Sequence, residues 1–267
     1  MAGLNGKVLV VTGASSGIGR ALCLALAEQR PRLVLAARDA QRLGEVAAAC
    51  EAKGADVLVV PTDVSSQAEC RRLVESAVAR FKAIDVLVNN AGIGMLAAFD
   101  QVQDLAGYET LMKVNYLGSV YPTYYALPEL KKTGGQIVTI ASVAGLTGVP
   151  QRTAYSASKH ALFGFFDSLR IELAGTGVGV TMVAPDFVVS EIQKRALGPD
   201  GQPLGQSPLK AEKIMSAERC AGLIVRAIGR RQRLLITSWR GRLGRFAKLV
   251  APGLVDGIAR RAVERGH

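Results

Sequence analysis

The strongest constraint on the fold is an alternation of short apolar runs with longer helical patterns. The runs are nearly continuous stretches of aliphatic residues, which is typical of parallel strands covered on both faces. They lie at 8–11, 33–36, 57–60, 86–88, 137–140, 178–183 and 234–236. The helical patterns cover residues 17–29, 40–52, 66–81, 104–131, 152–174 and 216–229. We therefore predict an α/β protein, a single doubly wound domain over 1–267 with about seven parallel strands and helices on both faces.

Composition narrows the class of protein. Of the 267 residues, 49% are hydrophobic and 21% charged, so the chain can bury a core, and no segment is long and apolar enough for a secretory signal or a membrane span. Widely spaced cysteines and only two histidines argue against a disulfide framework and against a metal site. These residues are Cys23, Cys50, Cys70, Cys220, His160 and His267. We expect a cytoplasmic protein.

The basic charge is concentrated in the tail. The net charge is +11, and the segment from Arg226 onward holds 11 Lys and Arg against 2 Asp and Glu. Residues 240–267 form a basic amphipathic C-terminal extension, with apolar positions 254, 255, 258, 259, 262 and 263 on one helical stripe. We favour packing of this stripe on the domain or on a partner subunit over contact with an anionic membrane surface. Nucleic acid is not an expected partner, because the tail carries no recognisable binding motif.

A glycine-rich turn follows the first apolar run. Residues 12–19 read Thr-Gly-Ala-Ser-Ser-Gly-Ile-Gly and lead into a helix, whose free N–H groups and dipole can receive a pyrophosphate. Gly13, Gly17 and Gly19 allow the backbone to approach the phosphates. The spacing differs from the common G-x-G-x-x-G fingerprint, so this turn alone is also compatible with an ordinary tight turn.

A tyrosine and a lysine stand four residues apart on one predicted helix face. The ammonium of Lys159 can stabilise a phenolate at Tyr155 and so lower the pKa of the phenol, which makes it a usable general acid or base. Such a pair is common on protein surfaces. Ser142 and the Asn-Asn-Ala-Gly run at 89–92 follow neighbouring strands, however, and ligands bind at the carboxyl ends of parallel strands.

Together these motifs resemble the classical short-chain dehydrogenases/reductases. T-G-x-x-x-G-x-G, N-N-A-G, the serine and Y-x-x-x-K occur in the family's order and spacing, and the resemblance covers nearly the whole chain. It implies a Rossmann fold in which Tyr155 is the proton donor and Ser142 binds the carbonyl oxygen. It further implies that Lys159 holds the nicotinamide ribose, and that Asn115 holds a proton-relay water.

The resemblance also implies a nicotinamide cofactor. The second strand ends in Ala37-Arg38 where an NAD-selective chain carries an acidic residue, so we predict NADP(H), with Arg38 facing the 2′-phosphate. Asn89 is expected at the start of the cofactor cleft and Asp63 at the adenine. The implied cofactor-binding residues are Gly13, Ser15, Ser16, Gly17, Ile18, Gly19, Arg38, Asp63, Val64, Asn89, Ala91, Gly92, Tyr155, Lys159, Pro185, Val188 and Ser190.

Two segments bear on the substrate. The family usually has P-G-x-V-x-T after the sixth strand, whereas here Asp186 replaces the glycine and either shapes substrate choice or caps a helix. The Gly- and Pro-rich stretch within 190–215 is predicted to form a substrate lid. Residues 113–122 resemble a segment of 3-ketodihydrosphingosine reductases, and the chain is similar to hydroxysteroid dehydrogenase-like members.

We therefore expect an NADP(H)-dependent oxidoreductase that interconverts a ketone and a secondary alcohol on a lipid-like or steroid-like substrate, with 3-ketodihydrosphingosine a candidate. One alternative is a 3-oxoacyl-carrier-protein reductase. Another is a non-catalytic NADP-binding sensor or scaffold, although such a protein has no need of the four residues of the proton relay. By resemblance to the family, we expect a homodimer or homotetramer.

Overall fold

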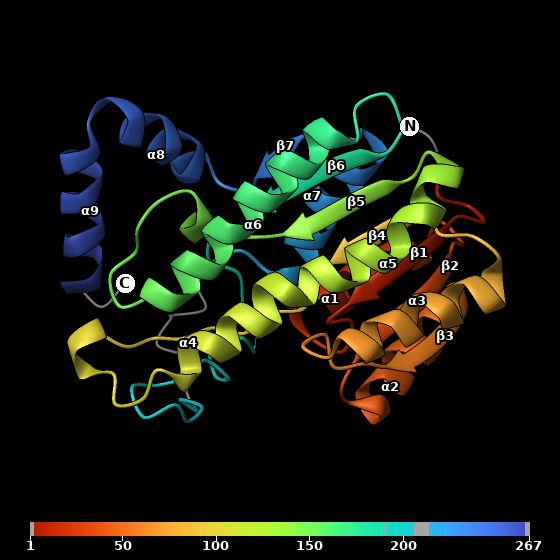
Figure 1. The fold of residues 1–267 in the computed structure, drawn as a ribbon, viewed down its shortest axis with the longest axis horizontal. Coiled ribbons are helices and arrows are strands. Elements are labelled where there is room, and N and C mark those ends of the chain that lie inside the picture. The colour runs from red at the N-terminus through yellow and green to blue at the C-terminus, as the bar shows by residue number, and fades with distance from the viewer. Residues whose placement is uncertain (1–2, 190, 206–213, 265–267) are drawn as a thin grey trace.

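Seven parallel strands form the centre of the molecule (Figure 1). The computed structural model describes residues 3–189, 191–205 and 214–264. The strands are β1 (Val8–Thr12), β2 (Arg32–Ala37), β3 (Asp56–Pro61), β4 (Val86–Asn89), β5 (Gln136–Ile140), β6 (Gly179–Ala184) and β7 (Leu234–Ile236). Their order in the sheet is β3-β2-β1-β4-β5-β6-β7, which confirms the predicted doubly wound domain.

Helices cover both faces of the sheet because the strands present apolar side chains to both. Leu9 and Val11 of β1 belong to one core cluster, whereas Val8 and Val10 belong to the other. The first cluster includes side chains of α1 (Gly17–Ala27), α2 (Ala40–Glu51) and α7 (Ala217–Gly229). The second includes side chains of α3 (Gln67–Phe81), α5 (Gly118–Thr133) and α6 (Thr153–Glu172). Burial on two sides explains the continuous apolar runs.

The helix predicted over 104–131 is not continuous. It consists of α4 (Ala106–Leu111), a π-helical turn η2 (Met112–Leu117) and α5. A π turn inserts one residue without changing the apolar character of the segment, so the sequence period does not reveal it. Two short 3₁₀ turns, η1 (Phe99–Gln101) and η3 (Val143–Gly145), follow β4 and β5.

The tail forms two helices, α8 (Trp239–Val250) and α9 (Pro252–Glu264), at the upper left in Figure 1. The predicted stripe lies on α9, and α8 was not predicted as a separate helix. A hydrogen bond from Lys248 Nζ to the carbonyl oxygen of Leu146 (3.4 Å) ties α8 to the loop after β5. Large apolar side chains nevertheless remain more than half exposed, so packing on the domain does not account for them. They are Trp239, Leu243, Phe246, Leu249, Val250, Leu254 and Ile258.

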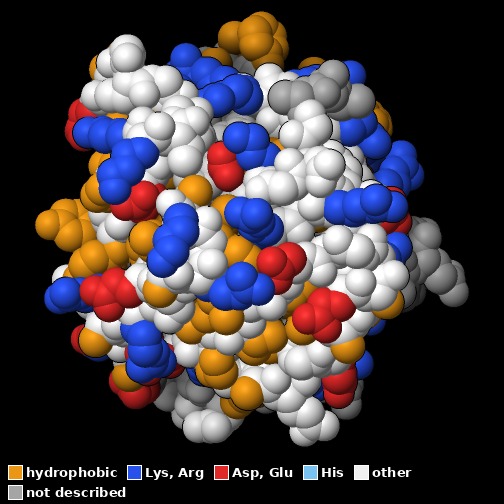
Figure 2. Space-filling view, turned by 90° about the vertical axis from the view of Figure 1, so that its right-hand side faces the viewer, with side chains coloured by type: hydrophobic (Ala, Val, Ile, Leu, Met, Phe, Trp, Pro, Cys, Tyr) orange, Lys and Arg blue, Asp and Glu red, His pale blue; other side chains and the backbone are white. Residues whose placement is uncertain are grey.

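The opposite side of the molecule carries charges of both signs. Figure 2 shows Lys and Arg interspersed with Asp and Glu on the side that carries α2, α3 and β3. Ion pairs there include Arg71 with Glu75 (2.7 Å) and Arg80 with Asp56 (3.0 Å). The excess of basic charge therefore lies away from this face, as the sequence predicts. Within the described part of the chain, no helix is both long enough and apolar enough to cross a membrane.

Candidate active site

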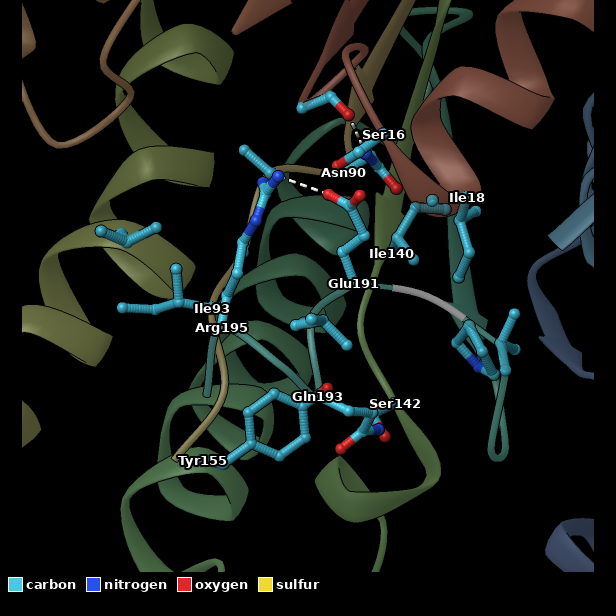
Figure 3. A pocket seen from close by; sticks show the side chains of 18 of the residues that line it. Ser16, Ile18, Asn90, Ile93, Ile140, Ser142, Tyr155, Glu191, Gln193 and Arg195 are labelled. Atoms are coloured by element: carbon cyan, nitrogen blue, oxygen red, sulfur yellow. Dashed lines mark hydrogen bonds and ion pairs between the residues drawn. The ribbon is translucent and has the colours of Figure 1, made fainter. Parts of the chain in front are cut away.

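A cleft of about 540 Å³ opens at the carboxyl ends of the strands, where the chain order reverses between β1 and β4. Figure 3 shows Ser16 and Asn90 toward one end, and Ser142, Tyr155 and Gln193 toward the other. Most of the site residues expected from the sequence line this cleft. They are Gly13, Ser15, Ser16, Gly17, Ile18, Arg38, Asp63, Val64, Ala91, Gly92, Ser142, Tyr155, Lys159, Pro185 and Val188.

The glycine-rich turn forms one wall of the cleft. Two of its glycines are required because neighbouring atoms lie too close to leave room for a side chain. Gly13 has a φ of +65°, and a Cβ there would lie 2.8 Å from the Cα of Ala91. A Cβ on Gly19 would overlap the carbonyl oxygen of Gly13 and the side-chain nitrogen of Asn90. Gly19 itself does not line the cleft. The turn leaves the first N–H groups of α1 without a side-chain cap, which suits a bound pyrophosphate.

Thr12 and Asn90 hold this wall in place, and neither was among the predicted site residues. The Thr12 hydroxyl accepts hydrogen bonds from the backbone N–H of Asn90 (3.0 Å) and of Ala91 (3.1 Å). Asn90 Nδ2 donates to the carbonyl oxygens of Thr12 (2.9 Å) and Gly13 (3.1 Å). Two chain segments that are far apart in the sequence are thereby fixed as one cradle.

Asn89, which the sequence analysis assigned to the cleft, lies behind it. Its side chain is buried, and its Nδ2 donates to the hydroxyl of Thr123 on α5 (2.9 Å). Successive strand residues point to opposite faces, so of two adjacent asparagines only one faces the glycine-rich turn. The alternation does not tell which one, and the structure places Asn90 there.

The end of the cleft at β2 and β3 is lined by Arg38 and Asp63. Arg38 is exposed, and the neighbouring Asp39 carboxylate accepts from the N–H of Arg42 (3.0 Å) as the cap of α2. Asp63 Oδ1 accepts from both the N–H (2.9 Å) and the hydroxyl (2.7 Å) of Ser65. Asp63 therefore shapes the turn into α3 and also faces the cleft.

Ser142 and Tyr155 meet at the other end. Ser142 caps the start of η3, the turn after β5, where its hydroxyl accepts from the N–H of Ala144 (3.1 Å). Tyr155 lies in the first turn of α6. Burial raises the pKa of the Tyr155 phenol, while hydrogen bonding to Ser142 and the nearby Arg152 guanidinium act in the lowering direction. The sequence predicted a lowered pKa, and this correction reflects desolvation, which residue spacing does not report.

Lys159 lies beneath the phenol ring. Its side chain is 3% exposed, its Nζ is 5.7 Å from the centre of the Tyr155 ring, and it donates to the carbonyl oxygen of Ile140 (3.0 Å). Burial lowers the pKa of Lys159 to about 8. The amine therefore changes charge near neutral pH, beside the ring of the tyrosine that it is expected to assist.

Asn115 is fully buried in η2 and does not line the cleft. Its Oδ1 accepts from the N–H of Ile93 (2.8 Å), and its Nδ2 donates to the carbonyl oxygen of Ile93 (3.0 Å) and to the hydroxyl of Ser158 (2.9 Å). These bonds join the loop after β4 to the residue beside Lys159. The side chain thus fixes the position of the cleft wall relative to α6.

The segment after β6 completes the cleft. Glu191 of this segment pairs with Arg42 at the start of α2 (2.8 Å) and also with Arg195. Within the predicted lid, 191–205 and 214–215 are described, whereas Ser190 lies outside the described residues. Asp186 Oδ2 accepts from the hydroxyl of Ser238 (2.6 Å), the residue that caps α8. The Asp186 carboxylate thus supports the cap of α8, and Asp186 also lines the cleft.

No group of three or more His, Cys, Asp or Glu side chains that could hold a metal ion occurs within 3–189, 191–205 and 214–264. The four cysteines are buried and unpaired. The chemistry that the described site can perform is therefore that of a phenol, a hydroxyl and an amine beside a cradle for phosphates.

Comparison with protein families and with curated proteins gives a consistent result. A family model described as short chain dehydrogenase matches residues 7–198. An 11-beta-hydroxysteroid dehydrogenase A of Sesamum indicum is 37% identical over 261 residues, which cover 96% of this chain and 75% of that protein. An 11-beta-hydroxysteroid dehydrogenase-like 4A of Arabidopsis thaliana is 41% identical over 228 residues, covering 85% of this chain and 75% of that protein.

Two solved structures are similar over most of their length. A short chain dehydrogenase/reductase from Burkholderia phymatum in complex with NAD aligns with a TM-score of 0.83 and 29% identity, covering 95% of this chain and 96% of that one. An alcohol dehydrogenase from Thermococcus sibiricus complexed with 5-hydroxy-NADP aligns with a TM-score of 0.76 and 26% identity, covering 86% and 95%. These neighbours differ from each other in the nicotinamide cofactor that they bind.

Proposed function

The chain belongs to the short-chain dehydrogenase/reductase family, and on this premise we propose that it is an NADP(H)-dependent oxidoreductase that interconverts a ketone and a secondary alcohol on an apolar substrate. The observation that carries the proposal is the convergence of Ser142, Tyr155 and Lys159 on one cleft. A protein that only sensed the cofactor would have no use for a phenol beside a buried amine, which argues against a scaffold role.

The residues of the cleft fit a dinucleotide. The cradle at Gly13, Ser16 and Gly17 would hold the pyrophosphate, since these residues line the cleft at the start of α1, whose first N–H groups have no side-chain cap. Arg38 would face the 2′-phosphate, because the end of β2 presents this cation and no acidic side chain before Asp39. The remaining contacts would come from Asp63, Val64, Lys159, Pro185 and Val188, which line the same cleft. When bound, NADP(H) exchanges a hydride with the carbonyl carbon of the substrate.

The protein side chains handle the proton. In reduction, Tyr155 gives its hydroxyl proton to the carbonyl oxygen, and in oxidation the phenolate takes a proton from the alcohol. The Ser142 hydroxyl donates a hydrogen bond to the same oxygen and stabilises the charge that develops there. Lys159, beneath the ring, stabilises the phenolate. Asn115 supports the relay, since it bonds Ser158 beside that lysine.

The walls beyond Ser142 and Tyr155 support an apolar, lipid-like or steroid-like substrate. This part of the cleft is lined by Ile93, Val114, Val149, Ile192 and Leu197. The curated relatives described above are named for hydroxysteroids. A 3-oxoacyl-carrier-protein reductase remains the alternative, because it shares the same motifs.

We also propose that the surface formed by α8 and α9 rests on an anionic membrane surface. Exposed Trp239, Phe246 and Leu249 lie on helices that carry several arginines and two acidic residues, Asp256 and Glu264. Sedimentation with phosphatidylserine vesicles, compared with phosphatidylcholine vesicles, tests this contact. Light scattering tests the homodimer or homotetramer that the family resemblance implies.

The deciding experiment measures oxidation of NADPH and of NADH by the purified protein against long-chain ketones, steroid ketones and 3-oxoacyl thioesters. We expect turnover that prefers NADPH. Tyr155→Phe should abolish turnover and leave NADPH affinity nearly unchanged, because it removes only the proton. NADPH binding without turnover on any of these carbonyl compounds would contradict the enzymatic proposal.

A further inference from the structure

Arg152 lies at the substrate end of the cleft and has no role in the proton transfer described above. It caps the start of α6, three residues before Tyr155, and its partly buried side chain lines the cleft. Its Nη2 donates to Oε1 of Gln193 (3.4 Å), and its guanidinium is 5.8 Å from the centre of the Phe187 ring. The guanidinium is therefore held between α6 and the segment after β6.

No acidic side chain within 3–189, 191–205 and 214–264 neutralises the charge of Arg152. Among the residues that the structure describes, no Asp or Glu forms an ion pair with it. Arg195 lines the same cleft and offers a direct contrast, because it pairs with Glu191. Burial lowers the pKa of Arg152, which confirms that the surroundings disfavour its charge. A desolvated cation without a counter-ion is costly unless a ligand supplies one.

The surroundings define the rest of the ligand. Val149, Phe187 and Ile192 line the same part of the cleft, so a molecule that reaches Arg152 must present apolar surface on its way. A guanidinium offers five N–H donors in a planar fork that matches a carboxylate, and the Gln193 contact leaves most of them free. Arg195 is already paired with Glu191, so among the described residues Arg152 is the arginine left to bind an anion at this end of the cleft. One guanidinium balances the charge of a monovalent carboxylate better than that of a divalent phosphate.

We propose that Arg152 binds a carboxylate of the substrate, so that the enzyme acts on keto acids or hydroxy acids with an apolar chain or ring. This inference rests on the proposed oxidoreductase function and narrows it. It disfavours amino ketones such as 3-ketodihydrosphingosine, whose ammonium group would meet the Arg152 cation.

Binding tests the inference without requiring turnover. Calorimetric titrations of decanoate, decanol, decylamine and decyl phosphate, with and without NADPH, compare one apolar chain with four head groups. We expect decanoate to bind wild type about tenfold to a hundredfold more tightly than decanol, and more tightly than decyl phosphate or decylamine. Arg152→Gln should remove the preference over decanol. Arg195→Gln is the matched control, because it removes a cation that Glu191 already neutralises, and it should keep the preference.

Equal affinity of wild type for decanoate and decanol would overturn the inference, as would an Arg152→Gln protein that keeps the preference. Tighter binding of decyl phosphate than of decanoate would contradict the carboxylate assignment and indicate a phosphate ligand. These outcomes are independent of NADPH oxidation, so failure of the proposed enzymatic function is recognised separately.

Kinetics with matched oxo acids and their methyl esters supply the second test. Arg152→Gln should raise KM for the acid about tenfold or more and leave KM for the ester unchanged. Because the guanidinium lowers the pKa of Tyr155, the pH profile of kcat should shift toward higher pH, and by the same amount on acid and ester. Arg152→Lys should rescue part of the loss, because it restores the charge without the fork. Equal loss of kcat on acid and ester with KM for the acid unchanged would show that Arg152 acts only through Tyr155 and would refute the carboxylate site.

Discussion

The carboxylate of Asp186 accepts a hydrogen bond from the hydroxyl of Ser238 at 2.6 Å. The same hydroxyl accepts from the N–H of Gly241 (3.0 Å) as the cap of α8. One end of β6 is thereby joined to the helix that begins the basic tail. Because β6 also leads into the cleft, the attachment of the tail and the shape of the active site share a residue.

Asp186→Ala should therefore loosen α8. We expect the free energy of unfolding to fall by about 1–2 kcal/mol, since a partly buried charge-assisted hydrogen bond is lost. Hydrogen exchange of the α8 amides should become faster. Ser238→Ala and the double variant complete a mutant cycle, and additive effects in that cycle would contradict a direct interaction.

Gly19→Ala should damage the cofactor cradle. The added methyl overlaps the Gly13 carbonyl oxygen and Asn90 Nδ2, so the turn must shift. We expect a loss of stability of about 1–3 kcal/mol and NADPH affinity at least about tenfold weaker. Gly44→Ala is the control, because a Cβ at this position of α2 meets nothing within 4 Å. It should stabilise the protein by about 0.5–1 kcal/mol, and a similar result for both variants would refute the steric argument.

Asn115→Ala should separate the loop after β4 from α6. The substitution leaves the partly buried N–H and carbonyl groups of Ile93 without their side-chain partner and also removes the bond to Ser158, at a cost of about 2–4 kcal/mol. Ser158→Ala keeps both Ile93 bonds. It removes the bond from Asn115 Nδ2 and also the bond that the Ser158 hydroxyl donates to the carbonyl oxygen of Tyr155 (2.8 Å), so it should cost about 1–2 kcal/mol. Urea denaturation of the two variants measures the difference. Equal costs would indicate that the Ile93 contact contributes nothing.

Burial of Lys159 should make stability depend on pH. The folded pKa of about 8 lies below the usual 10.5, so the unfolded chain binds more protons between these values. The penalty for burying this amine is fully present below pH 8 and is relieved as the pH rises toward 10.5. Wild type should gain about 3 kcal/mol relative to Lys159→Met across that interval. Parallel stability profiles of the two proteins from pH 7 to 10 would contradict the depressed pKa.

Arg38→Ala should change cofactor preference. Removal of the cation at the end of β2 should weaken NADPH binding by about tenfold to a hundredfold and leave NADH binding almost unchanged, since NADH lacks the 2′-phosphate. Fluorescence titration with both cofactors measures the ratio. Lys131→Ala, at the far end of α5, controls for the change in net charge. Equal weakening of both cofactors would assign Arg38 another role.

Local residue patterns in the sequence determined the architecture, whereas the order of the strands in the sheet came from the structure. The continuous apolar runs predicted the parallel strands, and the parallel order predicted that Gly13, Ser142 and Tyr155 meet at one edge. The i,i+4 spacing predicted that Lys159 lies next to Tyr155. These inferences succeed because helix and strand periods are local, and because parallel strands bring their carboxyl ends together.

Only the tertiary structure decided the features that depend on contacts between distant segments. It placed Asn90 in the cleft and Asn89 behind it, bound Asp186 to Ser238, and brought Arg152 next to Gln193 with no acidic partner in the part of the chain that the structure describes. It also reversed the predicted direction of the Tyr155 pKa shift. The desolvation of a side chain and its ion pairs depend on all residues that surround it in space. Many of those residues are distant in the sequence, so a local sequence pattern does not reveal them.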